Sequence, residues 1–249
     1  MFKSIVLAIT MLLGQSGQDL FLINTDQLKE KVADKEALKK LKKLAKTYKG
    51  ANKEFNLLVE NQADEFAVAL TPMETESQDL RKAFRNYKLE GLNDLSNLMD
   101  LRIQIQSIPE TEEWNEYVED VFTETKIPDE SEITDDLRSL KQLIELEKAV
   151  RTVFLDSKYE TQALDSFQKY VQTLVDITRN EADRQLATGQ ILVRKNASRN
   201  QLQKTLEDRF LFQDAMADAF IRFRADILKI SDPEDWNQIV PELSKLVYE

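Results

Sequence analysis

Apolar residues recur at three- and four-residue intervals along most of this chain, which places them on one side of an α-helix. The longest clear case begins near Ser77 and continues to Ile108, where Pro109 is expected to end the helix. Further helices are expected over residues 25–49, 52–70, 111–122, 134–155 and 201–230, and after Pro233. The pattern predicts an all-α fold, an elongated helical bundle.

The segment between residues 158 and 230 is open to two interpretations. Apolar residues continue through 167–177, and a polar run at 194–198 follows Gly189. The polar run is either a loop between two helices or the middle of one very long helix, because a single glycine costs a helix about 1 kcal/mol.

The two tryptophans, Trp114 and Trp236, are each followed by an asparagine, Asn115 and Asn237, and stand 122 positions apart. The same offset aligns further residues: Leu80 with Leu202, Phe84 with Leu206, Leu98 with Phe220, Met99 with Ile221, Leu101 with Phe223, Arg102 with Arg224, Ile105 with Ile227 and Ile108 with Ile230. This alignment predicts two related helix-loop-helix halves, residues 17–128 and 129–249, since an internal repeat sets the architecture of a chain. The alternative is a chance resemblance, because two helical corners look alike once they are aligned on tryptophan.

Residues 1–16 are predicted to be a cleaved signal peptide. Lys3 precedes the apolar run Ile5–Leu13, and Gly14 and Ser16 stand at the positions that a signal peptidase prefers to be small. The run is shorter than the roughly 20 residues that a membrane span requires. The expected location is therefore periplasmic or secreted. The alternative is an apolar N-terminal helix that remains part of the core.

Composition narrows the function classes. Five Gly and five Pro are few for 249 residues, which favours helix over sheet. The net charge of −11 argues against a nucleic-acid-binding protein. The absence of Cys and His removes the commonest nucleophile, general base and transition-metal ligands. No enzyme activity, cofactor or metal is expected.

Acidic residues are concentrated over 110–136, which holds twelve acids and one base, Lys126. Clustered carboxylates bind calcium in some loops, but the run that starts at Asp129 lacks the glycine that an EF-hand loop requires. The other interpretation is a solvated linker between the two halves.

Residues 29–53 form a lysine-rich amphipathic helix in this prediction. They contain ten lysines, of which Lys39, Lys42, Lys43 and Lys46 are candidate interaction residues. A basic amphipathic helix can lie on an anionic membrane surface. It can equally be a surface helix whose lysines face solvent or the acidic half of the same protein.

The Trp-Asn pairs are the second candidate interaction site. An exposed Trp114 or Trp236 could stack on a sugar or fill a pocket of a partner. The competing interpretation places each tryptophan in the core, at the end of the bundle. Arg102 and Arg224 are expected to pair with acids of the corner that follows them.

These observations together predict an exported, non-enzymatic helical protein that acts through contacts with a protein partner, which could be a second copy of itself. In layout it is similar to the minor-pilus, adhesin-like subunits of bacterial conjugation and type IV secretion machines, a resemblance that rests on no specific motif. Two alternatives stand beside it. One is a ligand-binding or sensor-like domain with a pocket among aromatic residues, namely Phe210, Phe220, Phe223 and Trp236. The other is a peripheral membrane protein that uses the basic helix 29–53.

Overall fold

The structure is a computed structural model of the whole chain, and it describes residues 21, 23–124 and 133–248. Side chains are described for these residues except 59–60, 62–63, 86–92, 122–124, 133–140, 182–183, 185–186 and 247–248. Within the described ranges the secondary structure is helical and no strand occurs. The predicted all-α bundle is therefore confirmed.

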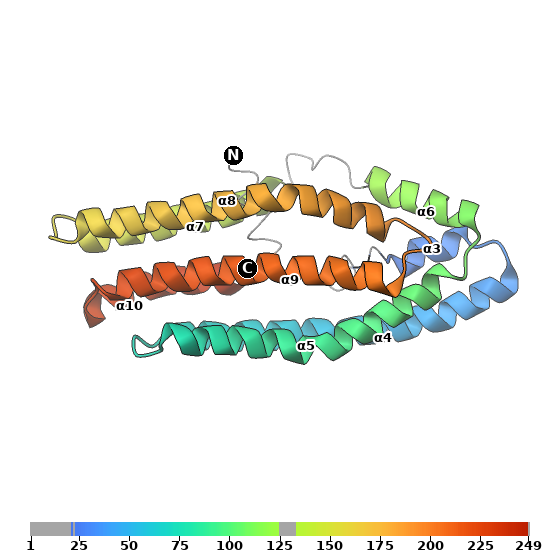
Figure 1. Cartoon of the computed structure of the whole chain (residues 1–249), viewed down its shortest axis with the longest axis horizontal. Coiled ribbons are helices and arrows are strands. Elements are labelled where there is room, and N and C mark those ends of the chain that lie inside the picture. The colour runs from blue at the N-terminus through green and yellow to red at the C-terminus, as the bar shows by residue number, and fades with distance from the viewer. Residues whose placement is uncertain (1–20, 22, 125–132, 249) are drawn as a thin grey trace.

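The structure describes a series of α-helices from Thr25 onwards. Their bounds are α3 (Thr25–Lys31), α4 (Lys35–Leu70), α5 (Ser77–Gln106), α6 (Thr111–Glu124), α7 (Ile133–Phe154), α8 (Glu160–Leu192), α9 (Arg199–Leu228) and α10 (Pro233–Tyr248). Figure 1 shows an elongated molecule in which the long helices run along the longest axis. Helices α3 and α6 lie toward one end of it and α10 toward the other.

Several helix ends follow directly from local sequence. The Asn24 side chain accepts hydrogen bonds from two backbone amides at the start of α3, as a capping residue should. Ser198 and Gln201 form a reciprocal capping box that begins α9. The predicted start of α10 is also confirmed, because the Asp232 carboxylate accepts from the next two free amides and Pro233 occupies the first helical position.

Two predicted boundaries are wrong. The helix expected over 25–49 is divided, because α3 ends at Lys31 and α4 begins at Lys35. No break separates the helices expected over 25–49 and 52–70, because α4 continues through Gly50 as a single helix of 36 residues. A glycine costs about 1 kcal/mol within a helix, and the packing of the residues on both sides of Gly50 offsets that cost. The region around 194–198 is a connection between α8 and α9, so the segment 158–230 forms two helices.

The buried apolar residues form two core clusters, one at each end of the molecule. The first cluster is built mainly by α7, α8, α9 and α10, and the second mainly by α3, α4, α5 and α6. Helix α9 packs against both α5 and α8, and it lies between them in Figure 1.

Two sequence predictions fall on residues that the structure does not describe. The predicted signal peptide, residues 1–16, and the start of the acidic run at Asp129 both lie outside the described ranges. None of the described helices combines the length and apolar character that a bilayer span demands. Among the described residues, no group of three or more acidic side chains is placed to hold a metal ion.

Candidate functional site

Both tryptophans lie in the interior of the protein. Trp114 is 1% exposed and Trp236 is 2% exposed, and each belongs to a different core cluster. The asparagines that follow them, Asn115 and Asn237, are exposed, each as the fifth residue of its helix, α6 or α10. The indoles are therefore inaccessible to a sugar or a partner in this structure, which favours the core interpretation of the two corners.

The first arginine–tryptophan corner, Arg102 and Trp114, lies where α5 leads into α6. The Arg102 guanidinium is stacked on the indole, with Cζ 4.5 Å from the ring centroid. Its Nε donates to the carbonyl oxygen of Phe21 at 3.0 Å, and its terminal nitrogens donate to Gln106 Oε1 and to the carbonyl oxygen of Leu192, both at 2.8 Å. Every one of these acceptors is an uncharged oxygen.

The same corner contacts the C-terminal end of α8. Trp114 Nε1 donates a 2.8 Å hydrogen bond to the carbonyl oxygen of Val193, the C-cap of that helix. The amide of Gln106 donates to the carbonyl oxygen of Ala197 at 2.9 Å. The first corner thus supplies donors to a helix end whose own last-turn carbonyls lack intrahelical partners.

The second arginine–tryptophan corner, Arg224 and Trp236, lies where α9 leads into α10. The guanidinium Cζ is 5.2 Å from the indole centroid. Trp236 Nε1 donates to the carbonyl oxygen of Thr71, the C-cap of α4, at 2.7 Å. The guanidinium donates to three further backbone carbonyls around the same helix end, those of Leu70, Pro72 and Thr75.

These contacts correct the prediction that the two arginines pair with acids. Arg102 and Arg224 are almost completely buried, and among the described residues neither guanidinium has a carboxylate within ion-pair distance. The C-terminal end of a helix carries a partial negative charge, so it can accommodate a cation without a carboxylate. Burial lowers the pKa of Arg102 to about 10, and burial also lowers the pKa of Arg224. A pKa of about 10 leaves Arg102 charged at neutral pH.

The lysines of α4 form the second candidate site. Six of them recur at alternating intervals of four and three residues, and we call these the lysine stripe: Lys35, Lys39, Lys42, Lys46, Lys49 and Lys53. At 100° per residue this spacing keeps the stripe within about 80° of the helix circumference. With a rise of 1.5 Å per residue it extends over about 27 Å. All six lysines are exposed.

The apolar side of the same helix segment is occupied by the core. Leu41, Ala45 and Tyr48 are fully buried against the neighbouring helices. The four predicted interaction lysines are all exposed, and three of them lie on the lysine stripe, with Lys43 beside it. The helix therefore exposes its basic side to solvent, while its apolar side is buried in the protein core.

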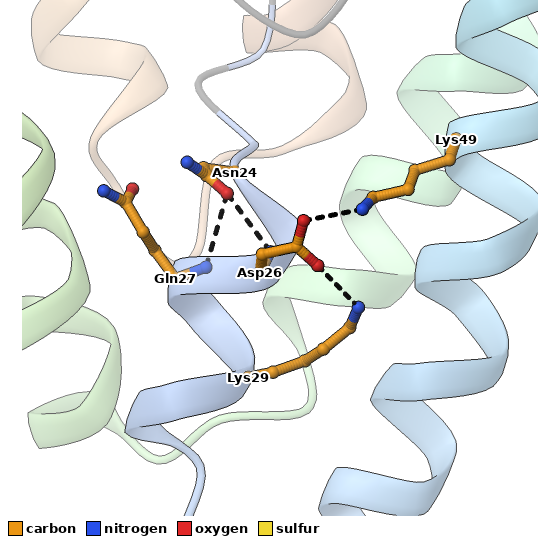
Figure 2. A network of polar contacts seen from close by, with 5 residues as sticks. All are labelled: Asn24, Asp26, Gln27, Lys29 and Lys49. Carbon is orange, nitrogen blue, oxygen red and sulfur yellow. Dashed lines mark hydrogen bonds and ion pairs between the residues drawn. The ribbon is translucent and has the colours of Figure 1, made fainter.

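One end of this basic face is fixed to α3 through Asp26. Figure 2 shows Lys29 of α3 and Lys49 of α4 converging on the two oxygens of its carboxylate. The nitrogen–oxygen distances are 2.9 Å and 2.6 Å. These hydrogen bonds, that of Lys49 foremost, lower the pKa of Asp26. The carboxylate is exposed, so the pairs contribute little stability and act mainly to orient Lys49.

The rest of the lysine stripe is electrostatically uncompensated within the described part of the chain. Of its six members, Lys49 alone has a described carboxylate within 4.0 Å. Lys31, which precedes α4, pairs with Asp120 of α6. Asp26 of α3 and Asp120 of α6 therefore neutralise Lys49 and Lys31, and the other five lysines of the stripe face solvent.

The aromatic residues proposed to line a ligand pocket are distributed over both cores. Phe220, Phe223 and Trp236 lie in one cluster, whereas Phe210 packs against the other. The Phe223 ring is stacked on Tyr170 with 4.8 Å between centroids. The structure does not bring the four predicted residues together as one site.

Comparison with protein-family models, with curated proteins and with solved structures gives no match to this chain. The geometry of the two sites is therefore the basis for the functional proposal. The sequence did not predict which groups accept hydrogen bonds from the two arginines, because these groups are mostly backbone carbonyls of distant residues. The one sequence signal was an arginine twelve positions before each tryptophan.

Proposed function

We propose that this protein is a non-enzymatic helical binding protein, and that the lysine stripe of α4 is its contact surface for an acidic protein. The observation that carries the proposal is a straight row of exposed lysines on a protein whose net charge is −11. A local concentration of one charge against the overall sign favours association with an oppositely charged partner.

The spacing of the stripe favours an acidic helix as the partner. Lysines at alternating intervals of four and three residues are separated by about 5 Å along the helix axis. A second helix with carboxylates at the same intervals presents charges at the same separation. The two rows can then face one another along their whole length, as charged rows do beside coiled-coil seams.

An anionic membrane is the second candidate, and one observation disfavours it. A helix that lies in a bilayer interface uses its apolar face for insertion. In α4 that face is buried, with Leu41 and Tyr48 fully covered. Among the described side chains of the helix, Leu57 is a large apolar residue that is exposed just beyond the lysine stripe. Membrane binding would depend on charge alone, at about 1 kcal/mol per lysine near an anionic surface.

Export is part of the proposal, supported by the arrangement of Lys3 and the apolar run Ile5–Leu13. Under it the protein is a periplasmic or secreted component, and the resemblance in layout suggests a structural or adhesin-like part of a bacterial secretion or conjugation apparatus. Expression of the full chain in a bacterial host should yield a protein shortened by about 16 residues in intact-mass analysis. Soluble protein that retains Met1 would contradict export.

The contact surface is tested with two variants of equal charge. The stripe variant replaces Lys39, Lys42, Lys43 and Lys46 with Gln. The dispersed control replaces four exposed lysines elsewhere with Gln: Lys82, Lys141, Lys169 and Lys204. Both variants should keep the helical circular dichroism and the urea midpoint of the parent, because exposed substitutions rarely change stability by more than about 0.5 kcal/mol.

Binding is then measured with two probes: a synthetic helical peptide bearing glutamates at intervals of four and three residues, and vesicles containing phosphatidylserine. The parent and the dispersed control should bind the peptide at low salt, and the stripe variant at least tenfold more weakly. Binding should fall toward 1 M salt, where the Debye length is about 3 Å. Equal losses in both variants would refute a specific stripe, and stronger binding to vesicles than to peptide would replace the protein partner with a membrane.

A further inference from the structure

Several helix ends in the two halves lie 122 residues apart. Helix α5 spans Ser77–Gln106 and α9 spans Arg199–Leu228, an offset of 122 at both ends. The same offset relates the last residues of α4 and α8, and the first residues of α6 and α10. The neighbours correspond as well, because α3 packs on α4 and α6 as α7 packs on α8 and α10.

The contacts between the halves obey the same offset and run in both directions. Trp114 donates to Val193 and Trp236 to Thr71, where Val193 stands 122 positions after Thr71. Likewise, Arg102 donates to Leu192 and Arg224 to Leu70. Each arginine–tryptophan corner therefore caps the equivalent helix end of the other half.

The cores are exchanged in the same way. Leu70 and Leu80, at the tip of the α4–α5 hairpin, belong to the cluster that α7 to α10 build. Leu192 and Leu202, at the tip of the α8–α9 hairpin, belong to the cluster that α3 to α6 build. Two unrelated hairpins of similar length have no reason to exchange the same positions. A reciprocal contact, in which residue i meets j and j meets i, is the signature of a two-fold interface.

We infer that residues 25–124 and 147–246 are two copies of one helical unit, and that the partner surface of each unit is built to receive a second copy of itself. The surface consists of the arginine–tryptophan corner and the core space beneath it. Each surface binds a segment of the other unit: the C-terminal end of α4 or α8 and the tip of the helical hairpin that follows it. Neither unit completes its core without the other, so the chain is a covalently joined, intertwined pair.

The units have diverged in detail around this shared arrangement. The carbonyl oxygens of Thr75 and Ala197, which are related by the offset, both accept a hydrogen bond from the opposite corner. The donor to Thr75 is Arg224, whereas the donor to Ala197 is Gln106. The accepting positions are thus retained while the donors differ, as expected for two copies that have changed separately.

The first test cuts the folded chain. A recognition sequence for a specific protease replaces residues 125–132 in the full-length protein, which is purified folded and then cleaved. The two fragments should elute together at the size of the uncut protein, keep its helical circular dichroism and separate in denaturant. Fragments that separate under native conditions, each retaining its helicity, would overturn the inference.

The second test uses the uncut chain and measures amide hydrogen exchange, to show whether each corner stabilises the helix end of the other half. Trp114→Phe keeps most of the ring volume but removes the indole donor, so it should raise amide hydrogen exchange near residues 190–197, in the other half. Trp236→Phe should do the same near residues 68–75. Increases confined to the mutated half, or a response from one variant without its counterpart, would contradict two equivalent units.

Discussion

Trp114 of α6 donates its indole hydrogen to the carbonyl oxygen of Val193, the residue that caps α8, at 2.8 Å. The corresponding bond at the other end joins Trp236 to Thr71 at 2.7 Å. Each tryptophan is buried in the core cluster of its own half. Its indole also donates a hydrogen bond to the C-terminal end of a helix in the other half. The stability of the two halves is consequently linked through both corners.

Removal of either indole should destabilise the whole protein. Truncation of a large buried aromatic side chain typically costs 3–5 kcal/mol. Trp114→Ala and Trp236→Ala should therefore each lower the free energy of unfolding by about that amount in urea titrations. Each core contains residues from both halves of the chain. The loss of stability should therefore appear as a shift of one cooperative unfolding transition. Two transitions, of which a single one moves, would indicate independent domains.

Substitution of the stacked arginines should be costly even when charge is kept. In Arg102→Lys an ammonium group replaces the planar guanidinium, which donates hydrogen bonds to three oxygen atoms. Each buried acceptor that loses its donor costs about 1–3 kcal/mol. We expect a loss of at least about 2 kcal/mol in urea unfolding. Arg222→Lys is the control, since that side chain is exposed and should change stability by less than about 0.5 kcal/mol. Equal effects would show that the backbone acceptors do not matter.

Two glycines inside helices are expected to be replaceable with a gain. A Cβ atom added to Gly50 or Gly189 would meet nothing within 4 Å beyond the adjacent residues and the nearby backbone of its own helix, and neither residue has a positive φ. Gly50→Ala and Gly189→Ala should each raise stability by about 0.5–1 kcal/mol, because alanine loses less backbone entropy in a helix. A raised urea midpoint with an unchanged slope would confirm this. A loss at Gly50 would mean that α4 requires a glycine there for a bend.

The carboxyl of Glu181 should make stability depend on pH. Burial, with a smaller contribution from Asp208, raises its pKa, while Arg184 at 3.4 Å opposes that shift. A raised folded-state pKa favours folding below the unfolded pKa, near 4.5, and this contribution is lost as the pH rises through the folded pKa. Glu181→Gln stays uncharged, so it should raise the melting temperature at pH 7 and leave it nearly unchanged at pH 4.

The pH contrast in that experiment separates charge from packing. The exposed Glu65 provides the matched control, and Glu65→Gln should alter stability by less than about 0.5 kcal/mol at either pH. A gain for Glu181→Gln that is equal at both pH values would assign the effect to packing.

By itself, the sequence determined the helical class and most helix ends. The three- and four-residue apolar spacing, the Pro109 stop and the cap before Pro233 act within a few residues, so they can be recognised without any tertiary information. The burial of Trp114 and Trp236 was one of two interpretations, and the offset between them was visible in the residues alone.

The tertiary structure decided which segments meet. The acceptors of Arg102 and Arg224 are backbone carbonyls, which every residue carries, so no residue type could reveal them. Gly50 stays within α4 because packing along the rest of the helix outweighs a local cost of about 1 kcal/mol. Leu70 lies in one core and Leu192 in the other because of contacts between distant residues: Arg224 contacts Leu70 across 154 positions, and Arg102 contacts Leu192 across 90. Local periodicity contains no information on contacts at such separations.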